Sequence, residues 1–213
     1  MIKIEKLGQI PYELGLEMQQ RLAEERRAGE IGDTVLLLEH DPVYTIGRTR
    51  DRSSLRDADR LPHPLVEISR GGQATFHGPG QLVGYLILDL NRYGKDLHTY
   101  LRTLEKILID TCNDLGLHAD RRDGLTGVWI EDRKLASIGI GVRHWISLHG
   151  FAVNVCGDLS AFEEITPCGI SGVEMSSISR ELGRQISTDE FARSLIPNLT
   201  QGLTDLANAD GGD

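Results

Sequence analysis

Hydrophobic positions recur along the chain with two different spacings, one typical of helices and one typical of strands. In residues 11–29, Leu14, Met18 and Leu22 follow each other at intervals of four, as on one face of a helix that ends near Gly29. Residues 97–117 repeat this pattern. Both segments are therefore predicted to be amphipathic helices that pack on a core.

Short apolar runs between these helices predict strands. TVLLLEH and LVGYLILDL read as buried strands, and LVEISR reads as a shorter one. GVWI, KLASIGIGVR and WISLHGFAVNV follow each other closely and predict an antiparallel meander, with the turn EDR between the first two. Near the C-terminus, STDE at residues 187–190 is a capping box before the helical pattern FARSLIPNL.

The order of these elements predicts the fold class. Strands and helices are mixed without regular βαβ alternation, which favours an α+β domain with a mixed or largely antiparallel sheet flanked by helices. We find no repeat or linker, so residues 1–205 are expected to form one domain, and residues 206–213 are expected to be a disordered tail. Residues 48–64, polar and broken by prolines, predict an exposed loop.

Composition narrows the functional classes. The net charge of −9 argues against nucleic acid as a partner, because phosphate contacts need an excess of lysine and arginine. No apolar run approaches the roughly 20 residues that a membrane span needs, and no signal peptide is evident, so we expect a cytoplasmic protein. The three cysteines lack the spacing of a zinc site, and we expect neither a metal nor a cofactor.

Three segments carry candidate chemistry. The stretch RGGQATFHGPGQ at residues 70–81 has four glycines, which allow close approach of a ligand to the backbone. A long connection between two strands is the alternative. Lys134 opens a strand whose alternation would place it with Ala136 and Ile138, among apolar neighbours. A buried lysine has a lowered pKa and can act as a base, whereas a lysine at a strand end can reach water.

Cys168, in ITPCGI, lies between a proline and a glycine, a geometry suited to the apex of a loop. Cys112 and Cys156 fit the alternative of small buried apolar residues better, because they lie on an apolar helix face and at the end of an apolar strand. Histidine is the commoner base for a catalytic cysteine, and His77 and His149 are both available.

The order and separation of RGGQATFHGPGQ, LVGY, KLASIG, HGFAVNV and ITPCGI closely resemble the lipoyl(octanoyl)transferase family, over about residues 35–180. The resemblance implies the fold of the biotin and lipoate protein ligase catalytic domains. It also implies an acyl thioester on Cys168 and a role for Lys134 in lowering the pKa of that cysteine. His77 then lines the acyl pocket and His149 is a packed strand residue. The implied substrate-binding residues are Arg70, Gly71, Gly72, Gln73, Ala74, Thr75, Phe76, His77, Ser137, Ile138, Gly139, Gly150, Phe151 and Ala152.

The implied reaction moves an octanoyl group from octanoyl-acyl carrier protein to a lysine of a lipoyl domain. The implied acceptors are the lipoyl domains of 2-oxoacid dehydrogenase E2 subunits and the glycine cleavage H protein. A thiolate suits this transfer, because it is both a nucleophile and a leaving group. Simple alternation puts Lys134 and Ser137 on opposite faces of the strand, so we expect either a bulge or backbone contacts from residues 137–139.

Three other functions are compatible with parts of this pattern. An ATP-dependent lipoate or biotin ligase would use the same fold, but it would need no cysteine nucleophile. An amidotransferase would move octanoyl between two protein lysines through a thioester. A non-catalytic module would bind carrier or lipoyl domains without needing Lys134 and Cys168.

Overall fold

The computed structural model describes residues 2–48, 52–169 and 172–209, and the side chain of Cys168 lies outside the described part. A central sheet has the strand order β1-β2-β6-β10-β9-β8-β7, and the short strand β11 also pairs with β9. The β1–β2 and β11–β9 pairs are parallel and the other pairs are antiparallel. The strands are β1 (Lys3–Ile10), β2 (Thr34–His40), β6 (Gln81–Ile87), β7 (Asp120–Arg122), β8 (Leu125–Ile130), β9 (Arg133–Arg143), β10 (Ile146–Asn154) and β11 (Glu174–Met175).

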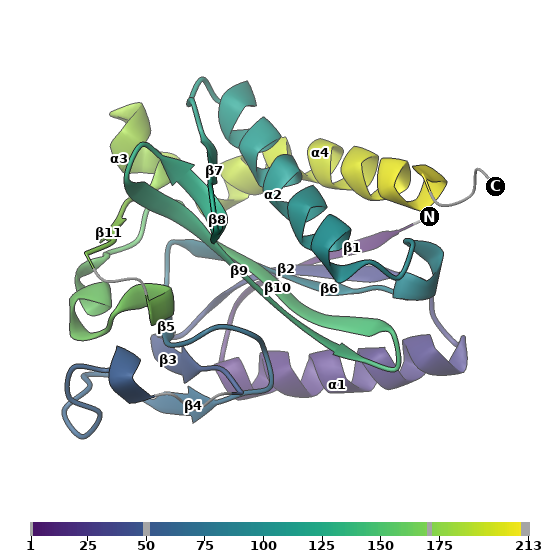
Figure 1. Cartoon of the computed structure of the whole chain (residues 1–213), viewed down its shortest axis with the longest axis horizontal. Helices are drawn as coiled ribbons and strands as arrows, with labels where there is room; N and C mark the ends of the chain where they lie inside the picture. The colour runs from purple at the N-terminus through teal and green to yellow at the C-terminus, as the bar shows by residue number, and fades with distance from the viewer. Residues whose placement is uncertain (1, 49–51, 170–171, 210–213) are drawn as a thin grey trace.

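Helices cover both faces of this sheet (Figure 1). The helix α1 (Tyr12–Ala28) packs on one face, and α2 (Leu97–Asp114) and α4 (Thr188–Ala209) pack together on the other. The main core lies beneath α2 and α4 and includes Leu104 and Leu199. The fold is the expected α+β domain with a mixed sheet. The remaining helical segments are η1 (Arg52–Ser54), η2 (Leu90–Arg92), η3 (Ser160–Glu164), η4 (Pro167–Gly169) and α3 (Ile178–Leu182).

A second, smaller sheet has the order β4-β3-β5 and lies beside β9 and β10 (Figure 1). Its strands are β3 (Val43–Ile46), β4 (Leu65–Glu67) and β5 (Thr75–His77). Tyr44, Phe76 and Phe162 form part of a separate apolar cluster between this sheet and η3. The glycine-rich segment therefore runs from the small sheet back to the central one, since β5 precedes β6.

Local sequence explains where the helices begin and end. Gly29 ends α1 with a left-handed backbone (φ 76°), as expected for a glycine cap. The side chain of Asp96 accepts hydrogen bonds from two backbone N–H groups at the start of α2. Ser187 Oγ accepts one from Glu190 N (3.1 Å) at the start of α4. Glu190 does not complete a reciprocal capping box, because its carboxylate pairs with Arg184 (3.1 Å).

Two further sequence predictions need correction. The buried residues of α1 are Tyr12, Gly15, Gln19, Leu22 and Arg26, so the inner face is rotated away from Leu14, which is 44% exposed. Because Gln19 and Arg26 are polar residues at buried positions, the spacing of apolar residues alone does not locate this face. In addition, α4 continues through Ala209, so residues 206–209 are helical where we expected a tail. Residues 210–213 lie outside the described part.

Candidate active site

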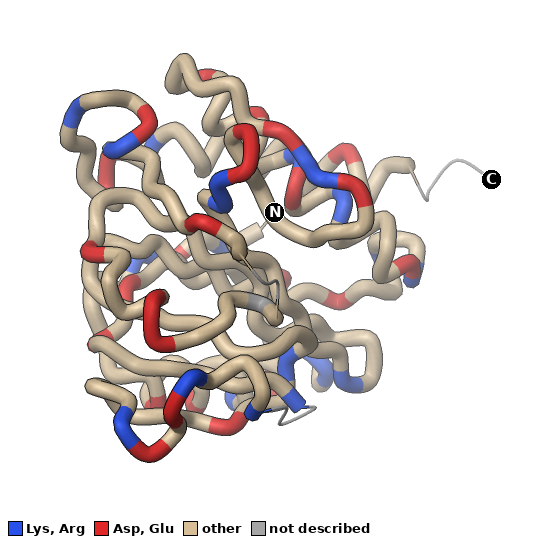
Figure 2. Tube along the Cα trace, turned by 60° about the vertical axis from the view of Figure 1, so that its left-hand side comes forward, with Lys and Arg blue, Asp and Glu red and all other residues tan. Residues whose placement is uncertain are grey.

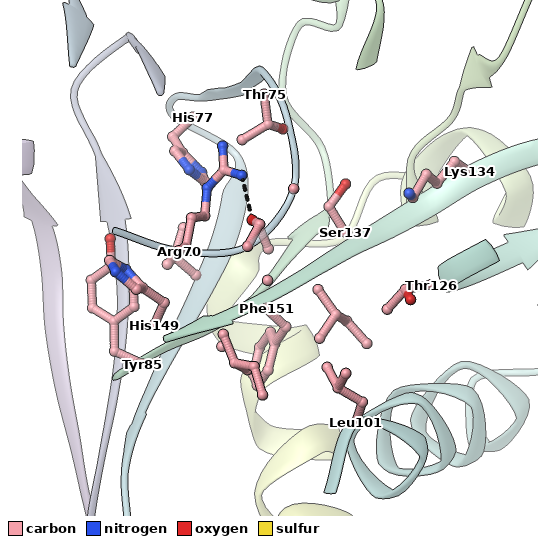
Figure 3. Close-up of a pocket in the computed structure, with 18 of the residues that line it drawn as sticks. Arg70, Thr75, His77, Tyr85, Leu101, Thr126, Lys134, Ser137, His149 and Phe151 are labelled. Atoms are coloured by element: carbon pink, nitrogen blue, oxygen red, sulfur yellow. Dashed lines mark hydrogen bonds between the residues drawn. The ribbon is translucent and has the colours of Figure 1, made fainter. Parts of the chain in front are cut away.

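A cavity of about 380 Å³ opens between the central sheet and the glycine-rich segment. Its walls are β9 and β10, the start of β8 and Leu101 of α2 (Figure 3). Most of the predicted substrate-binding residues line it. They are Arg70, Gly71, Gly72, Thr75, His77, Ser137, Ile138, Gly139, Gly150, Phe151 and Ala152, and Lys134 lines it as well.

Arg70 holds the glycine-rich segment in place. Its guanidinium donates hydrogen bonds to Thr45 O (2.9 Å), Thr45 Oγ1 (2.8 Å) and its neighbour Gly71 O (2.9 Å). Gly71 N donates to Ile140 O (3.0 Å), which ties the segment to β9. Gly72 needs a positive φ (85°), and its carbonyl oxygen would lie only 2.0 Å from a Cβ on Gly47. The segment is therefore a fixed wall of the cavity.

Lys134 lies in the wall, 1% exposed, with its Nζ 5.0 Å from the centre of the Trp129 ring. The register of β9 against β8 shifts here, so that Leu135 is an extra residue in β9. This bulge breaks the alternation of the strand. Lys134 and Ser137 consequently line the same cavity, whereas Ala136 packs into the core, so Lys134 does not share a face with Ala136 as simple alternation suggested.

Cys168 lies in η4, whose backbone contacts β5 and η1. A Cβ on its neighbour Gly169 would lie 2.0 Å from Gln73 Oε1, so this turn packs directly on the glycine-rich segment. A few residues later, β11 pairs with Arg133 and Lys134 of β9. The chain around Cys168 thus connects the glycine-rich segment to Lys134.

His77 and His149 lie at the other end of the cavity, and both are buried. Burial, with help from neighbouring His40 and Arg70, lowers the pKa of His77 to about 3. Burial, together with Arg70, lowers the pKa of His149 to about 4. Both imidazoles are neutral at pH 7, and groups with such low pKa values are poor proton acceptors from a thiol.

Some predicted contacts lie elsewhere, and some lining residues were not predicted. Ala74 and Phe76 belong to the apolar cluster beneath the small sheet. The residues that we did not predict are Tyr12, Val83, Tyr85, Leu101, Gly124, Leu125, Thr126 and Ile140, and His149, which we expected to be a packed strand residue, lines the cavity as well. The unpredicted residues come from α1, β6, α2, β9 and the start of β8 with the turn before it. Val83 and Tyr85 lie in the LVGY motif, to which we assigned no site role.

No group of three or more His, Cys, Asp or Glu side chains within the described ranges is arranged to hold a metal ion. No helix in those ranges is long and apolar enough to cross a membrane.

Curated relatives share about half of their residues with this chain. An octanoyltransferase of Geobacter sulfurreducens is 52% identical over 189 residues, which cover 89% of this chain and 79% of the relative. An octanoyltransferase of Geobacter metallireducens is 48% identical over 192 residues, which cover 90% of this chain and 89% of the relative.

Solved structures with the same fold are more distant in sequence. Lipoate-protein ligase A bound with ATP superposes with a TM-score of 0.75 at 16% identity, covering 97% of this chain and 92% of the other. A biotin protein ligase from Aquifex aeolicus superposes with a TM-score of 0.58 at 12% identity, covering 97% of this chain and 70% of the other. The sequence pattern of the lipoyl protein ligase A/B catalytic domain matches residues 11–200, and the chain belongs to this family.

Proposed function

We propose that this acyltransferase moves an octanoyl group from the thioester of octanoyl-acyl carrier protein to a lysine amine of a lipoyl domain. Cys168 carries the group between the two partners. One observation supports this most: the cavity joins buried Lys134 to an apolar wall that includes Ile138 and Phe151. The turn that holds Cys168 packs on Gln73, the neighbour of the cavity-lining Gly72. The names of the curated relatives agree with octanoyl transfer.

In the first step, the Cys168 thiolate attacks the thioester carbonyl of the donor. The bond between that carbonyl and the carrier sulfur breaks, and the carrier leaves as a thiol with the proton that Lys134 took from Cys168. In the second step, the acceptor amine attacks the new thioester. The bond to Cys168 breaks, Lys134 accepts the proton of the amine, and an amide forms.

Backbone N–H groups near the reacting carbonyl would stabilise the oxyanion of each tetrahedral intermediate, by about 3 kcal/mol per donor. Gly71 N is excluded from this role, because it already donates to Ile140 O (3.0 Å).

The acceptors that we propose are the lipoyl domains of 2-oxoacid dehydrogenase E2 subunits and the glycine cleavage H protein. An ATP-dependent ligase is the second candidate, since the superposing lipoate-protein ligase A was solved bound with ATP. Octanoyl transfer between two protein lysines is the third. Only the first reaction uses a carrier thioester as its donor.

Intact-mass spectrometry distinguishes these reactions. The protein is dialysed against EDTA and mixed with octanoyl-acyl carrier protein in the absence of nucleotide. We expect one added octanoyl group, which peptide mapping places on Cys168 and which a lipoyl domain then removes. Cys112→Ser should still form the adduct and Cys168→Ser should not. Strict dependence on ATP would support the ligase, and an adduct elsewhere would overturn the assignment of Cys168.

A further inference from the structure

The cavity has an exposed opening and a buried end. Gly72 and Thr126 at the opening are exposed, whereas Tyr12, Tyr85 and His149 at the other end are each less than 5% exposed. Figure 3 shows Lys134 on one side of the cavity and Tyr85 with His149 on the opposite side. An acyl chain attached near Lys134 therefore has its methyl end directed towards these tyrosine and histidine side chains.

Hydrogen bonds with consistent directions fix this buried end. A hydrogen bond joins the hydroxyl groups of Tyr12 and Tyr85, and the Tyr85 oxygen can accept in it because its own proton is directed to His40. Tyr85 Oη donates to His40 Nε2 (2.6 Å), and His40 Nδ1 donates to Ile10 O (3.0 Å). Burial raises the pKa of Tyr12 to about 12 and lowers that of His40, so these groups stay neutral at pH 7. Each of these groups is a hydrogen-bond partner of the next, so moving any one of them breaks a buried hydrogen bond.

His149 completes this surface. Its ring meets the Tyr85 ring edge to face, with centroids 6.3 Å apart, and its backbone N–H donates to Gln19 Oε1 (2.7 Å). Its Nε2 is buried and has no hydrogen-bond partner among the described residues. We call the cavity-lining residues Tyr12, Tyr85 and His149, together with His40 behind Tyr85, the polar wall.

We propose that the polar wall limits the length of the acyl chain that the cavity accepts, at about the octanoyl group. This inference depends on the proposed acyl transfer. Added methylenes would have to break the Tyr85–His40 hydrogen bond or lie against the polar edge of His149, and a buried polar group that loses its partner is costly. Shorter chains would leave apolar surface of Ile138 and Phe151 uncovered. Chain length is thus selected by polarity at the end of the cavity as well as by its size.

The variant His149→Gly tests this proposal. His149 has a positive φ (60°), which glycine adopts without strain, so the substitution removes the imidazole and keeps the backbone. Each newly accommodated methylene should increase kcat/KM about fourfold, from the free energy of burying one CH₂. The ratio of kcat/KM for decanoyl over octanoyl N-acetylcysteamine thioester should therefore rise about 15-fold. His149→Asn is the matched control, because asparagine also tolerates positive φ but keeps a polar side chain at the wall.

Tyr85→Phe is the second variant and keeps the size of the wall while removing its central hydroxyl. It should also raise the ratio of kcat/KM for decanoyl over octanoyl thioester, and it tests the proposal if His149→Gly does not fold. Octanoyl transfer by the unmodified protein is measured first, and its absence would count against the proposed function. If both variants transfer octanoyl with an unchanged decanoyl-to-octanoyl ratio, the role of the polar wall is overturned but the proposed function is not. An equal rise of this ratio in His149→Asn and His149→Gly would also overturn the role of the polar wall.

Discussion

Lys134 combines a buried position with a polar head, and its surroundings explain how the fold tolerates it. Its Nζ faces the Trp129 ring at 5.0 Å, and its backbone oxygen accepts a hydrogen bond from Ser176 N (3.0 Å). His77 and His149, at the other end of the cavity, have pKa values far below neutrality and are poor proton acceptors at pH 7, which is why Lys134 is the base in the proposed transfer.

Lys134→Met should shift iodoacetamide labelling of Cys168 to higher pH, because a proton acceptor and a positive charge are removed while side-chain length is kept. Labelling at a series of pH values, followed by peptide mapping, measures the shift. Cys112 and Cys156 are internal controls, since burial raises the pKa of both thiols, that of Cys112 to about 12. An unchanged profile for Cys168 would transfer the role of base to another group.

His149→Asn should make stability less sensitive to acid. The pKa of His149 is lowered to about 4 from its ordinary value near 6.5, so the unfolded chain binds a proton that the folded chain does not. This contribution is complete above about pH 6.5 and is lost as the pH falls towards 4. Urea unfolding at pH 7, 6 and 5 should show a slope that is smaller by up to about 1.4 kcal/mol per pH unit in the variant. Parallel slopes would contradict the neutral, buried imidazole.

At the scale of elements, the pairing of β8 with β9 positions the lysine. Gly127 of β8 has a φ of 133°, and a Cβ there would lie 2.5 Å from Ala136 O and 2.7 Å from Lys134 Cε. The buried carboxylate of Glu105 accepts the Gly127 N–H (3.0 Å) and also pairs with Arg102 and Arg121. Together, Glu105 and Gly127 leave room for the side chain of Lys134.

Gly127→Ala should therefore reduce octanoyl transfer by at least about tenfold, because the new methyl group displaces Lys134 by a fraction of an ångström or more. Gly116→Ala is the control, since Gly116 also has a positive φ (88°) but a Cβ there meets nothing within 4 Å. Gly116→Ala should lose about 1 kcal/mol of stability from backbone strain, and Gly127→Ala should lose more because of its contact with Ala136 O, both measured by thermal unfolding. Equal activity in the two variants would show that Gly127 does not position the lysine.

The same strands show what the sequence predicts and what it does not. The meander of β8, β9 and β10 was predicted, because each strand is a β-rich run bounded by a turn. A bulge in β9 was one of two alternatives, the other being backbone contacts from residues 137–139. The sequence of β9 alone does not distinguish them, because a register shift depends on the partner strand. Tyr12 and Tyr85 were missed for a related reason. They are 73 positions apart in the sequence and meet only because α1 packs across β6.

For the whole molecule, the arrangement of charge bears on how the proposed donor, an acidic carrier protein, would approach. The net charge is −9, and acidic and basic positions are interspersed along the trace in Figure 2. Arg48, Arg52 and Arg56 are exposed near the glycine-rich segment, and Arg48 N donates to Arg70 O (3.1 Å). Arg52 pairs with Glu67 only at 3.4 Å, and both side chains are exposed, so this ion pair contributes little. The same polar loop also contains Arg50, which lies outside the described residues.

Reversing Arg48, Arg52 and Arg56 to glutamate should raise KM for octanoyl-acyl carrier protein and reduce its salt dependence, because a local positive surface offsets the repulsion between two acidic proteins. A small octanoyl thioester should react as before. The control reverses Arg21, Arg27 and Arg193, which are also exposed and change the net charge by the same amount. A similar rise in KM for both triple variants would mean that net charge alone governs the encounter. Loss with the small thioester would mean a damaged site, and no loss with either donor would place the docking surface elsewhere.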